Sequence, residues 1–171
     1  MSVMSPRAQP RLRSDFPRFC TVPTRWGDND VYGHVNNAVY YTYFDTVINQ
    51  HLIASGALDI AQGEVIGLVV QTGCHYFAPL HYPDPVEVGL IAAEVGRTSV
   101  RYEVGLFAPG AELSAAWGHF VHVYVDRTHR KPTAVTEALR RALLPLQRPV
   151  TTNHSSAFPS PSSATSAPCT P

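Results

Sequence analysis

Near its beginning, the chain places five chemically complementary side chains within ten positions. They are Asp28, Asp30, His34, Asn36 and Asn37, which together supply two carboxylates, an imidazole and two amides. An apolar segment with helical periodicity follows directly, so the unpaired N–H groups of a helix start would lie beside them. Such donors can hold the oxygen of a polarised carbonyl, and a carboxylate facing the same point can attack that carbonyl or deprotonate a water. This segment therefore predicts a site that hydrolyses an activated acyl group.

Two elements flank the polar segment and would hold it in place. Residues 19–26 alternate in polarity and are rich in β-formers, which predicts a strand. Residues 38–55 contain neither Gly nor Pro and repeat apolar side chains at spacings of three and four, which predicts a helix of about five turns. Asn36 is expected to cap the start of this helix, and Gly56 to end it in the left-handed conformation. Gly33 is expected to take a positive φ where the loop turns into the helix.

Further strands are predicted after the helix, followed by a short amphipathic helix. The strands cover 64–80, 86–96, 99–108 and 113–126, and the helix covers 133–146, capped by Thr133 or Thr136. Consecutive strands joined by short turns pair antiparallel, and the apolar face of such a sheet needs the long helix as its cover. We therefore expect an α+β fold in which a curved antiparallel sheet wraps around a long central helix.

The two ends of the chain differ in composition from its middle. Residues 148–171 are dominated by Ser, Thr, Pro and Ala, so few groups can be buried and we expect a disordered tail. Residues 1–16 are expected to form a second disordered tail, which leaves one domain over 17–147. No apolar run approaches the length of a membrane span. We expect a cytoplasmic protein, with a mitochondrial transit peptide in the Arg-rich N-terminal segment as the alternative.

Composition also narrows the partners and cofactors. The 13 Lys and Arg residues balance 13 Asp and Glu residues, and this zero net charge does not favour a nucleic-acid partner. Cys20, Cys74 and Cys169 lie far apart and match neither a disulfide framework nor the spacing of zinc ligands. His119 and His122 are three apart on a predicted strand, so they fall on opposite faces and are not expected to share a metal.

The segment Arg25–Asp45, "RWGDNDVYGHVNNAVYYTYFD", resembles the signature of the 4-hydroxybenzoyl-CoA thioesterase-like family. The shared pattern is D-x-D-x-x-G-H-V-N-N-x-x-Y-x-x-Y, and the order of elements stays similar to about Asp126. This resemblance implies a hotdog fold and an acyl-CoA thioesterase that releases a free carboxylic acid and CoA. It also implies a homodimer or homotetramer with active sites at the subunit interface. Because a thioester is already activated, we expect its hydrolysis to need no metal and no cofactor.

The resemblance also implies a role for each matched residue. Asp30 corresponds to the family's catalytic carboxylate, acting as nucleophile or general base. The backbone N–H of Asn37 would polarise the thioester carbonyl, and His34 would orient the acid or the water. The CoA phosphates would lie near the turn between the third and fourth strands, at Arg97, Thr98 and Ser99, with Arg101 as a weaker candidate. Asp45 lies near the place of another family acid, but its register is loose and no catalytic role is expected.

Other interpretations of the same residues remain open. Asp28 is expected to be structural, because an Asp before a helix commonly caps it or makes an Asx turn. A hotdog hydratase or dehydratase is one alternative function, but its usual Asp-x-Asn-Pro-x-His arrangement spaces acid and His by five. Asp30 and His34 are four apart, without that Asn or Pro between them. The second alternative is a non-catalytic protein that binds acyl thioesters.

Overall fold

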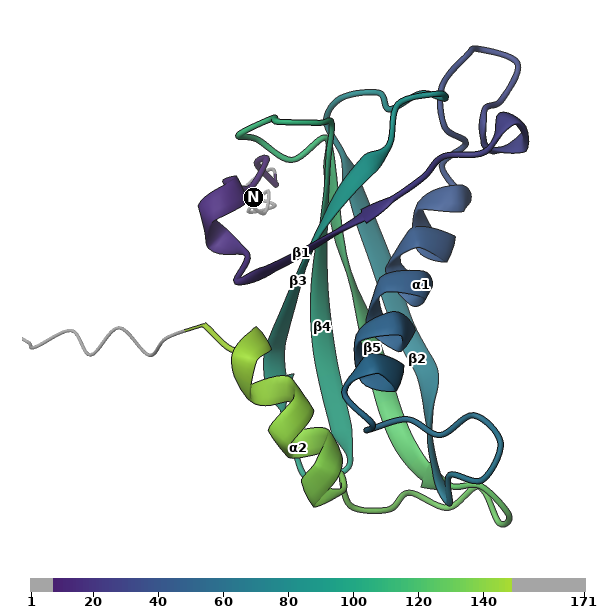
Figure 1. Cartoon of the computed structure of the whole chain (residues 1–171). Coiled ribbons are helices and arrows are strands. Elements are labelled where there is room, and N and C mark those ends of the chain that lie inside the picture. The colour runs from purple at the N-terminus through teal and green to yellow at the C-terminus, as the bar shows by residue number, and fades with distance from the viewer. Residues whose placement is uncertain (1–7, 149–171) are drawn as a thin grey trace, which may run out of the picture.

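The computed structural model of the chain describes residues 8–148, which form one sheet with two helices (Figure 1). The strands are β1 (Arg18–Val22), β2 (Val65–Tyr76), β3 (Val86–Val95), β4 (Ser99–Phe107) and β5 (Ala116–Asp126). The helices are α1 (Val39–Ala54) and α2 (Glu137–Leu143), and short 3-10 turns cover Arg13–Asp15, Trp26–Asp28 and Leu144–Leu146. None of the helices in the described part is long and apolar enough to cross a membrane.

All five strands belong to one antiparallel sheet in the order β1-β3-β4-β5-β2. The long helix α1 runs along one face of this curved sheet (Figure 1). One extra residue, Val70, bulges out of β2 opposite β5, and another, Ala93, bulges out of β3 opposite β4. Such bulges bend a strand and increase its twist. The predicted α+β hotdog fold is confirmed.

The buried face of α1 holds helix and sheet together. Phe44 and Ile48 are completely buried, and full burial of one such side chain contributes about 1.5–3 kcal/mol. Phe44 packs over Gly118 of β5, where a Cβ would come within 2.6 Å of the Phe44 ring. Glycine at this position therefore allows the close approach between the helix and the sheet.

Several element boundaries differ from those expected. The strand predicted over 19–26 ends at Val22, just before Pro23, whose ring nitrogen cannot donate to a strand ladder. The strand predicted to reach Leu80 ends at Tyr76. Of the two proposed caps for the last helix, Thr136 is the one used: its Oγ1 accepts a hydrogen bond from the Leu139 N–H at 3.2 Å.

Both glycines expected to be left-handed are so, with φ of +80° at Gly33 and +70° at Gly56. At the start of α1, Asn36 Oδ1 accepts a hydrogen bond from the Ala38 N–H at 2.9 Å. The regular helix begins one residue later, at Val39. Asn36 therefore closes the turn that leads into α1.

A short N-terminal segment, residues 8–16, packs on the sheet ahead of the expected domain boundary at Pro17. Arg11 and Arg13 form ion pairs with Glu103 and Glu87, both at 2.6 Å. Phe16 is 5% exposed and lies edge-on against the ring of Phe107. The packed part of the chain therefore begins before Pro17, and residues 1–7 and 149–171 of the two expected tails lie outside the described residues.

Candidate active site

The polar loop before α1 is held by backbone hydrogen bonds. The Asp30 N–H donates to the His34 carbonyl at 2.8 Å, and the Gly33 N–H donates back to the Asp30 carbonyl at 3.1 Å. The positive φ of Gly33 fits this tight turn. The Val35 N–H donates to the Leu80 carbonyl at 2.7 Å, which ties the loop to the segment after β2. These hydrogen bonds hold the loop in one conformation at the start of the helix.

Asp28 is buried beneath this loop, with an exposed fraction of 2%. Its Oδ2 accepts hydrogen bonds from the Arg25 N–H and the Tyr43 hydroxyl, both at 2.8 Å, and its Oδ1 accepts one from Arg25 Nε at 3.1 Å. Burial favours a higher pKa for Asp28, but these hydrogen bonds and the Arg25 charge outweigh it and leave the pKa below its usual value. Both oxygens are therefore used inside the fold, in keeping with the structural role expected for Asp28.

Asp30 lies two residues further on, half-buried at the rim of the same loop. Its Oδ1 accepts the Tyr32 N–H at 2.8 Å and the His34 N–H at 3.4 Å. Its Oδ2 has no hydrogen bond to any residue in the described part of the chain. The carboxylate is therefore held by one oxygen, while the other is available to a substrate or a water.

The other two residues assigned to catalysis are both exposed, and they differ in how they are held. The Asn37 carbonyl accepts a hydrogen bond from the Tyr76 hydroxyl at 3.1 Å, and the Asn37 N–H has no partner among residues 8–148. The His34 ring lies 6.0 Å from the His81 ring and, within the described chain, makes no hydrogen bond to Asp30. The Asn37 N–H is thus available to a ligand. Within a single chain, however, the His34 side chain makes no hydrogen bond to the Asp30 carboxylate.

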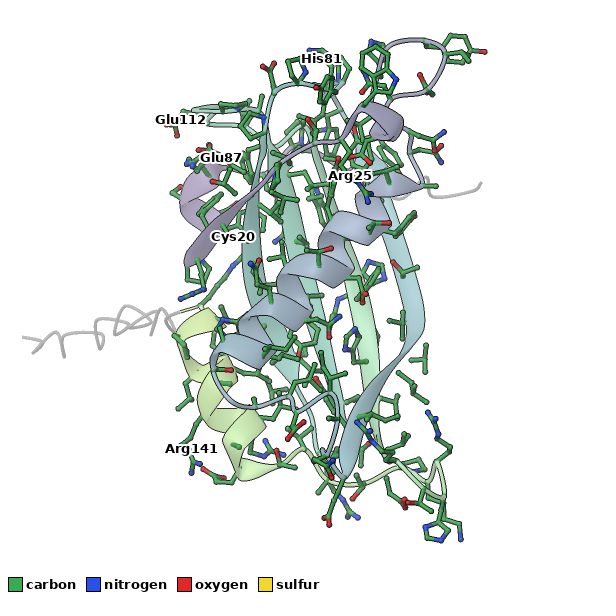
Figure 2. The ribbon with its side chains drawn as sticks, turned by 45° about the vertical axis from the view of Figure 1, so that its right-hand side comes forward. Cys20, Arg25, His81, Glu87, Glu112 and Arg141 are labelled. Atoms are coloured by element: carbon green, nitrogen blue, oxygen red, sulfur yellow. The ribbon has the colours of Figure 1, made fainter. Side chains whose placement is uncertain are left out.

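The residues expected to bind CoA lie at the other end of the fold. Arg97, Thr98 and Ser99 form the turn between β3 and β4, where the Arg97 carbonyl accepts a hydrogen bond from the Val135 N–H at 2.8 Å, just before α2. Figure 1 shows this turn beside α2 at one end of α1, with the polar loop at the opposite end. In Figure 2, His81 lies at the loop end and Arg141 at the α2 end. Within a single chain, this turn and Asp30 therefore lie at opposite ends of the fold.

Cys74 and Tyr76, near the end of β2, were not among the residues selected from the sequence. Tyr76 packs edge-on against Tyr40 at 5.0 Å, and Cys74 is half-buried two residues before it. Burial raises the pKa of Cys74 to about 11, so its thiol is protonated at neutral pH and poorly suited to act as a nucleophile. The alternation of β2 could have placed both side chains on its inner face, but not beside the start of α1.

His119 and His122 fall on opposite faces of the sheet, as predicted, and only His122 is buried under α1. Within residues 8–148, no group of three or more His, Cys, Asp or Glu side chains is arranged to hold a metal ion.

Comparison with known proteins places this geometry in a family. The sequence profile of the thioesterase-like superfamily matches residues 24–143, which include the polar loop, both helices and four of the five strands, β2 to β5. A comparison with curated proteins gave no match. The solved PA5185 protein from Pseudomonas aeruginosa strain PAO1 is 50% identical, with a TM-score of 0.79 over 81% of this chain and 97% of that chain.

Two other solved structures, unlike the PA5185 protein, have the word thioesterase in their names. A thioesterase from Thermus thermophilus, complexed with coenzyme A and Zn, is 30% identical, with a TM-score of 0.62 over 75% of this chain and 92% of that chain. The BH1999 gentisyl-coenzyme A thioesterase shares the fold at 21% identity, with a TM-score of 0.65 over 74% of this chain and 99% of that chain. The sequence-based prediction of a thioester hydrolase with a hotdog fold is confirmed at the level of the family. The chain belongs to the thioesterase-like superfamily.

Proposed function

We propose that the chain hydrolyses acyl-CoA thioesters to a free carboxylic acid and CoA, with Asp30 as its central catalytic residue. The contrast between two neighbouring carboxylates carries this proposal. Asp28 uses both oxygens in hydrogen bonds inside the fold, whereas Asp30 Oδ2 has no partner in the described chain. The available N–H of Asn37 lies at the helix start that follows the same loop, where backbone donors favour negative charge.

The chemistry needs few groups, because a thioester is already activated. The thioester carbonyl oxygen accepts the Asn37 N–H, which stabilises the negative charge that develops on that oxygen. Asp30 either takes a proton from a water that attacks the carbonyl carbon, or attacks that carbon itself to give an anhydride that water later hydrolyses. In both routes the C–S bond breaks, CoA leaves as a thiolate that takes up a proton, and the acid is released.

A complete site requires a second copy of the chain. β2 forms one edge of the sheet, and Val69 and Val70 on it are 45% and 61% exposed. A two-fold axis through this edge would pair β2 antiparallel with its copy and set the two α1 helices antiparallel. The end of the partner that lies farthest from the partner's own polar loop would then be next to Asp30 of the first chain. That far end carries the Arg97–Ser99 turn, so CoA would be bound across the two chains.

The direct test is thiol release from acyl-CoAs of graded chain length by wild type and Asp30→Asn. The substitution keeps the shape of the side chain and removes its charge and most of its basicity. We expect a loss of at least about a hundredfold in kcat, which is the effect of removing a nucleophile or general base. Asp15→Asn, in the N-terminal segment, is the matched control and should retain wild-type rates. Near-normal rates in Asp30→Asn would refute the assignment.

A further inference from the structure

A cavity of about 400 Å³ lies toward the far end of α1 from the polar loop. Its walls come from the C-terminal half of α1, the chain after it, the start of β2 and the end of β5. Leu52, Val65 and Leu139 contribute apolar surface, and Asn49 and His122 bring polar groups to the wall. Pockets that bind small molecules have volumes of about 300–1,000 Å³, and this cavity falls in that range. It is therefore large enough to take a medium-length acyl group.

His122 is the unexplained residue of this wall. It is 3% exposed, and its Nε2 is buried without a hydrogen-bond partner among the described residues. The rings of Tyr102 and Tyr124 lie beside it, with centroids 5.1 and 6.3 Å away. Burial lowers the pKa of His122, against an opposing effect of Asp45, so the ring is neutral at neutral pH and has one donor and one acceptor. Nε2 is covered by the fold, so the ring atom open to a ligand in the cavity is Nδ1, which faces Gly67 of the cavity wall and has no hydrogen-bond partner within residues 8–148.

The groups around His122 leave space and hydrogen-bonding capacity at the cavity. A Cβ on Gly67 would come within 3.0 Å of His122 Nδ1, so a glycine here gives the ring room on the β2 side. Asn49 Nδ2 donates to the Asp45 carbonyl at 2.9 Å, while Asn49 Oδ1 has no partner within residues 8–148. The Tyr124 hydroxyl, by contrast, is paired with that of Tyr102 at 2.8 Å. The cavity wall therefore combines apolar surface with two unpaired polar atoms, His122 Nδ1 and Asn49 Oδ1.

We propose that this cavity is the acyl pocket and that His122 selects acyl groups that carry a hydroxyl or keto oxygen on the chain. This inference rests on the proposed thioesterase function and names its substrate class. A hydroxyl would donate to the neutral ring, and a keto oxygen would accept from it. A plain acyl chain would leave the ring unpaired, and a site built to hydrogen-bond a substrate discriminates against the analogue that lacks the group.

The two-fold pairing of β2 also connects this cavity to the proposed catalytic residues. If the axis passes near the bulge at Val70, Val65 of one chain lies opposite the other copy of Tyr76. Tyr76 is the residue whose hydroxyl holds the Asn37 carbonyl at the helix start. The cavity of one chain would then open beside the thioester site of the other, and an acyl chain extending from that site would enter it.

The experiment compares kcat/KM for decanoyl-CoA, 3-hydroxydecanoyl-CoA, 3-oxodecanoyl-CoA and 10-hydroxydecanoyl-CoA in wild type and His122→Phe. The substitution keeps a ring among aromatic neighbours and removes both nitrogens. We expect wild type to prefer at least one oxygenated substrate about tenfold, the effect of one well-made hydrogen bond. In His122→Phe this preference should fall to near unity while decanoyl-CoA is still hydrolysed. His119→Phe, on the opposite face of the same strand, is the matched control and should keep the preference.

Each outcome bears on the proposal. Hydrolysis without any preference in wild type, or a preference that survives in His122→Phe, would overturn the role of His122 and leave the thioesterase function standing. No thiol release from any of the four substrates would overturn both. If His122→Phe does not fold, as judged by circular dichroism, Asn49→Leu removes the other unpaired polar atom. In that variant, an unchanged preference would refute the polar pocket, and a reduced one would support it.

Discussion

Asp28 and Asp30 should separate stability from activity. Asp28→Asn removes the charge from three hydrogen bonds in a buried place. Bonds to a charged acceptor contribute about 1.5–3 kcal/mol and neutral ones about 0.5–1.5 kcal/mol, so the bonds from the Arg25 N–H and Tyr43 each weaken by about 1 kcal/mol. The third bond, from the Arg25 side chain, is largely solvent-screened, because that side chain is 70% exposed. The expected loss in the free energy of unfolding is about 2–3 kcal/mol.

Urea unfolding followed by circular dichroism measures this loss. We expect an unchanged slope and a lower midpoint for Asp28→Asn, because the substitution alters stability and not the area exposed on unfolding. Asp30→Asn is the paired variant: its remaining oxygen can still accept the Tyr32 N–H, so its stability should stay within about 1 kcal/mol of wild type while thiol release collapses. The reverse pattern, a stable Asp28→Asn and an unstable Asp30→Asn, would refute the division of roles.

Other parts of the structure give three more predictions. The folded-state pKa of Asp28 is depressed, so its contribution to stability is present above the ordinary Asp pKa of about 3.9 and is lost as pH falls toward the folded value. Tyr43→Phe removes one bond to the carboxylate, so unfolding measured against pH should show a shallower acid loss; an equal slope would contradict this. Gly118→Ala places a methyl group against Phe44 and the Gly73 carbonyl and should cost about 1–3 kcal/mol, read as a lower Tm; an unchanged Tm would show that the helix can shift. Val70→Lys would bring two like charges together at the proposed two-fold axis, so light scattering should show a monomer without activity, and a dimer would exclude this edge as the interface.

The fold could be predicted from the sequence because the helix and the strands have clear local patterns of apolar residues. The spacing of Phe44 and Ile48 predicted a buried helix face, and both side chains are fully buried there. Strand ends were predicted less well, because alternation continues past the point where pairing stops. The run from residue 19 to residue 26 is rich in β-forming residues to its end, yet the ladder ends at Val22. Alternation reports which side chains suit a strand, whereas the ladder depends on partners elsewhere in the sheet.

Local features of the polar loop, such as the positive φ of Gly33, could be predicted from the sequence, whereas its contacts with distant segments could not. The family resemblance gave Asp30 a different role from Asp28, but the sequence could not show the physical difference, which is that Tyr43 of α1 donates to Asp28 and not to Asp30. The same limit applies to His122. Its face on β5 follows from alternation, but the cavity beside it is formed by α1, the chain after α1, β2 and the start of α2, which meet only in the folded protein.

The bulge at Val70 bears on how β2 can change length during evolution. Before the bulge, Gly67 lies opposite Tyr124, and after it Cys74 lies opposite Gly118. Because side chains alternate, removing a residue from a regular strand transfers every later side chain to the other face of the sheet. A deletion at Val70 would remove only the unpaired residue, so both of these pairings would survive and the strand would lose its bend. β2 therefore has one residue more than its pairing with β5 requires, and it should tolerate the deletion of that residue. A single-residue deletion within β4, where every residue is paired in register, would instead turn the later side chains to the wrong face.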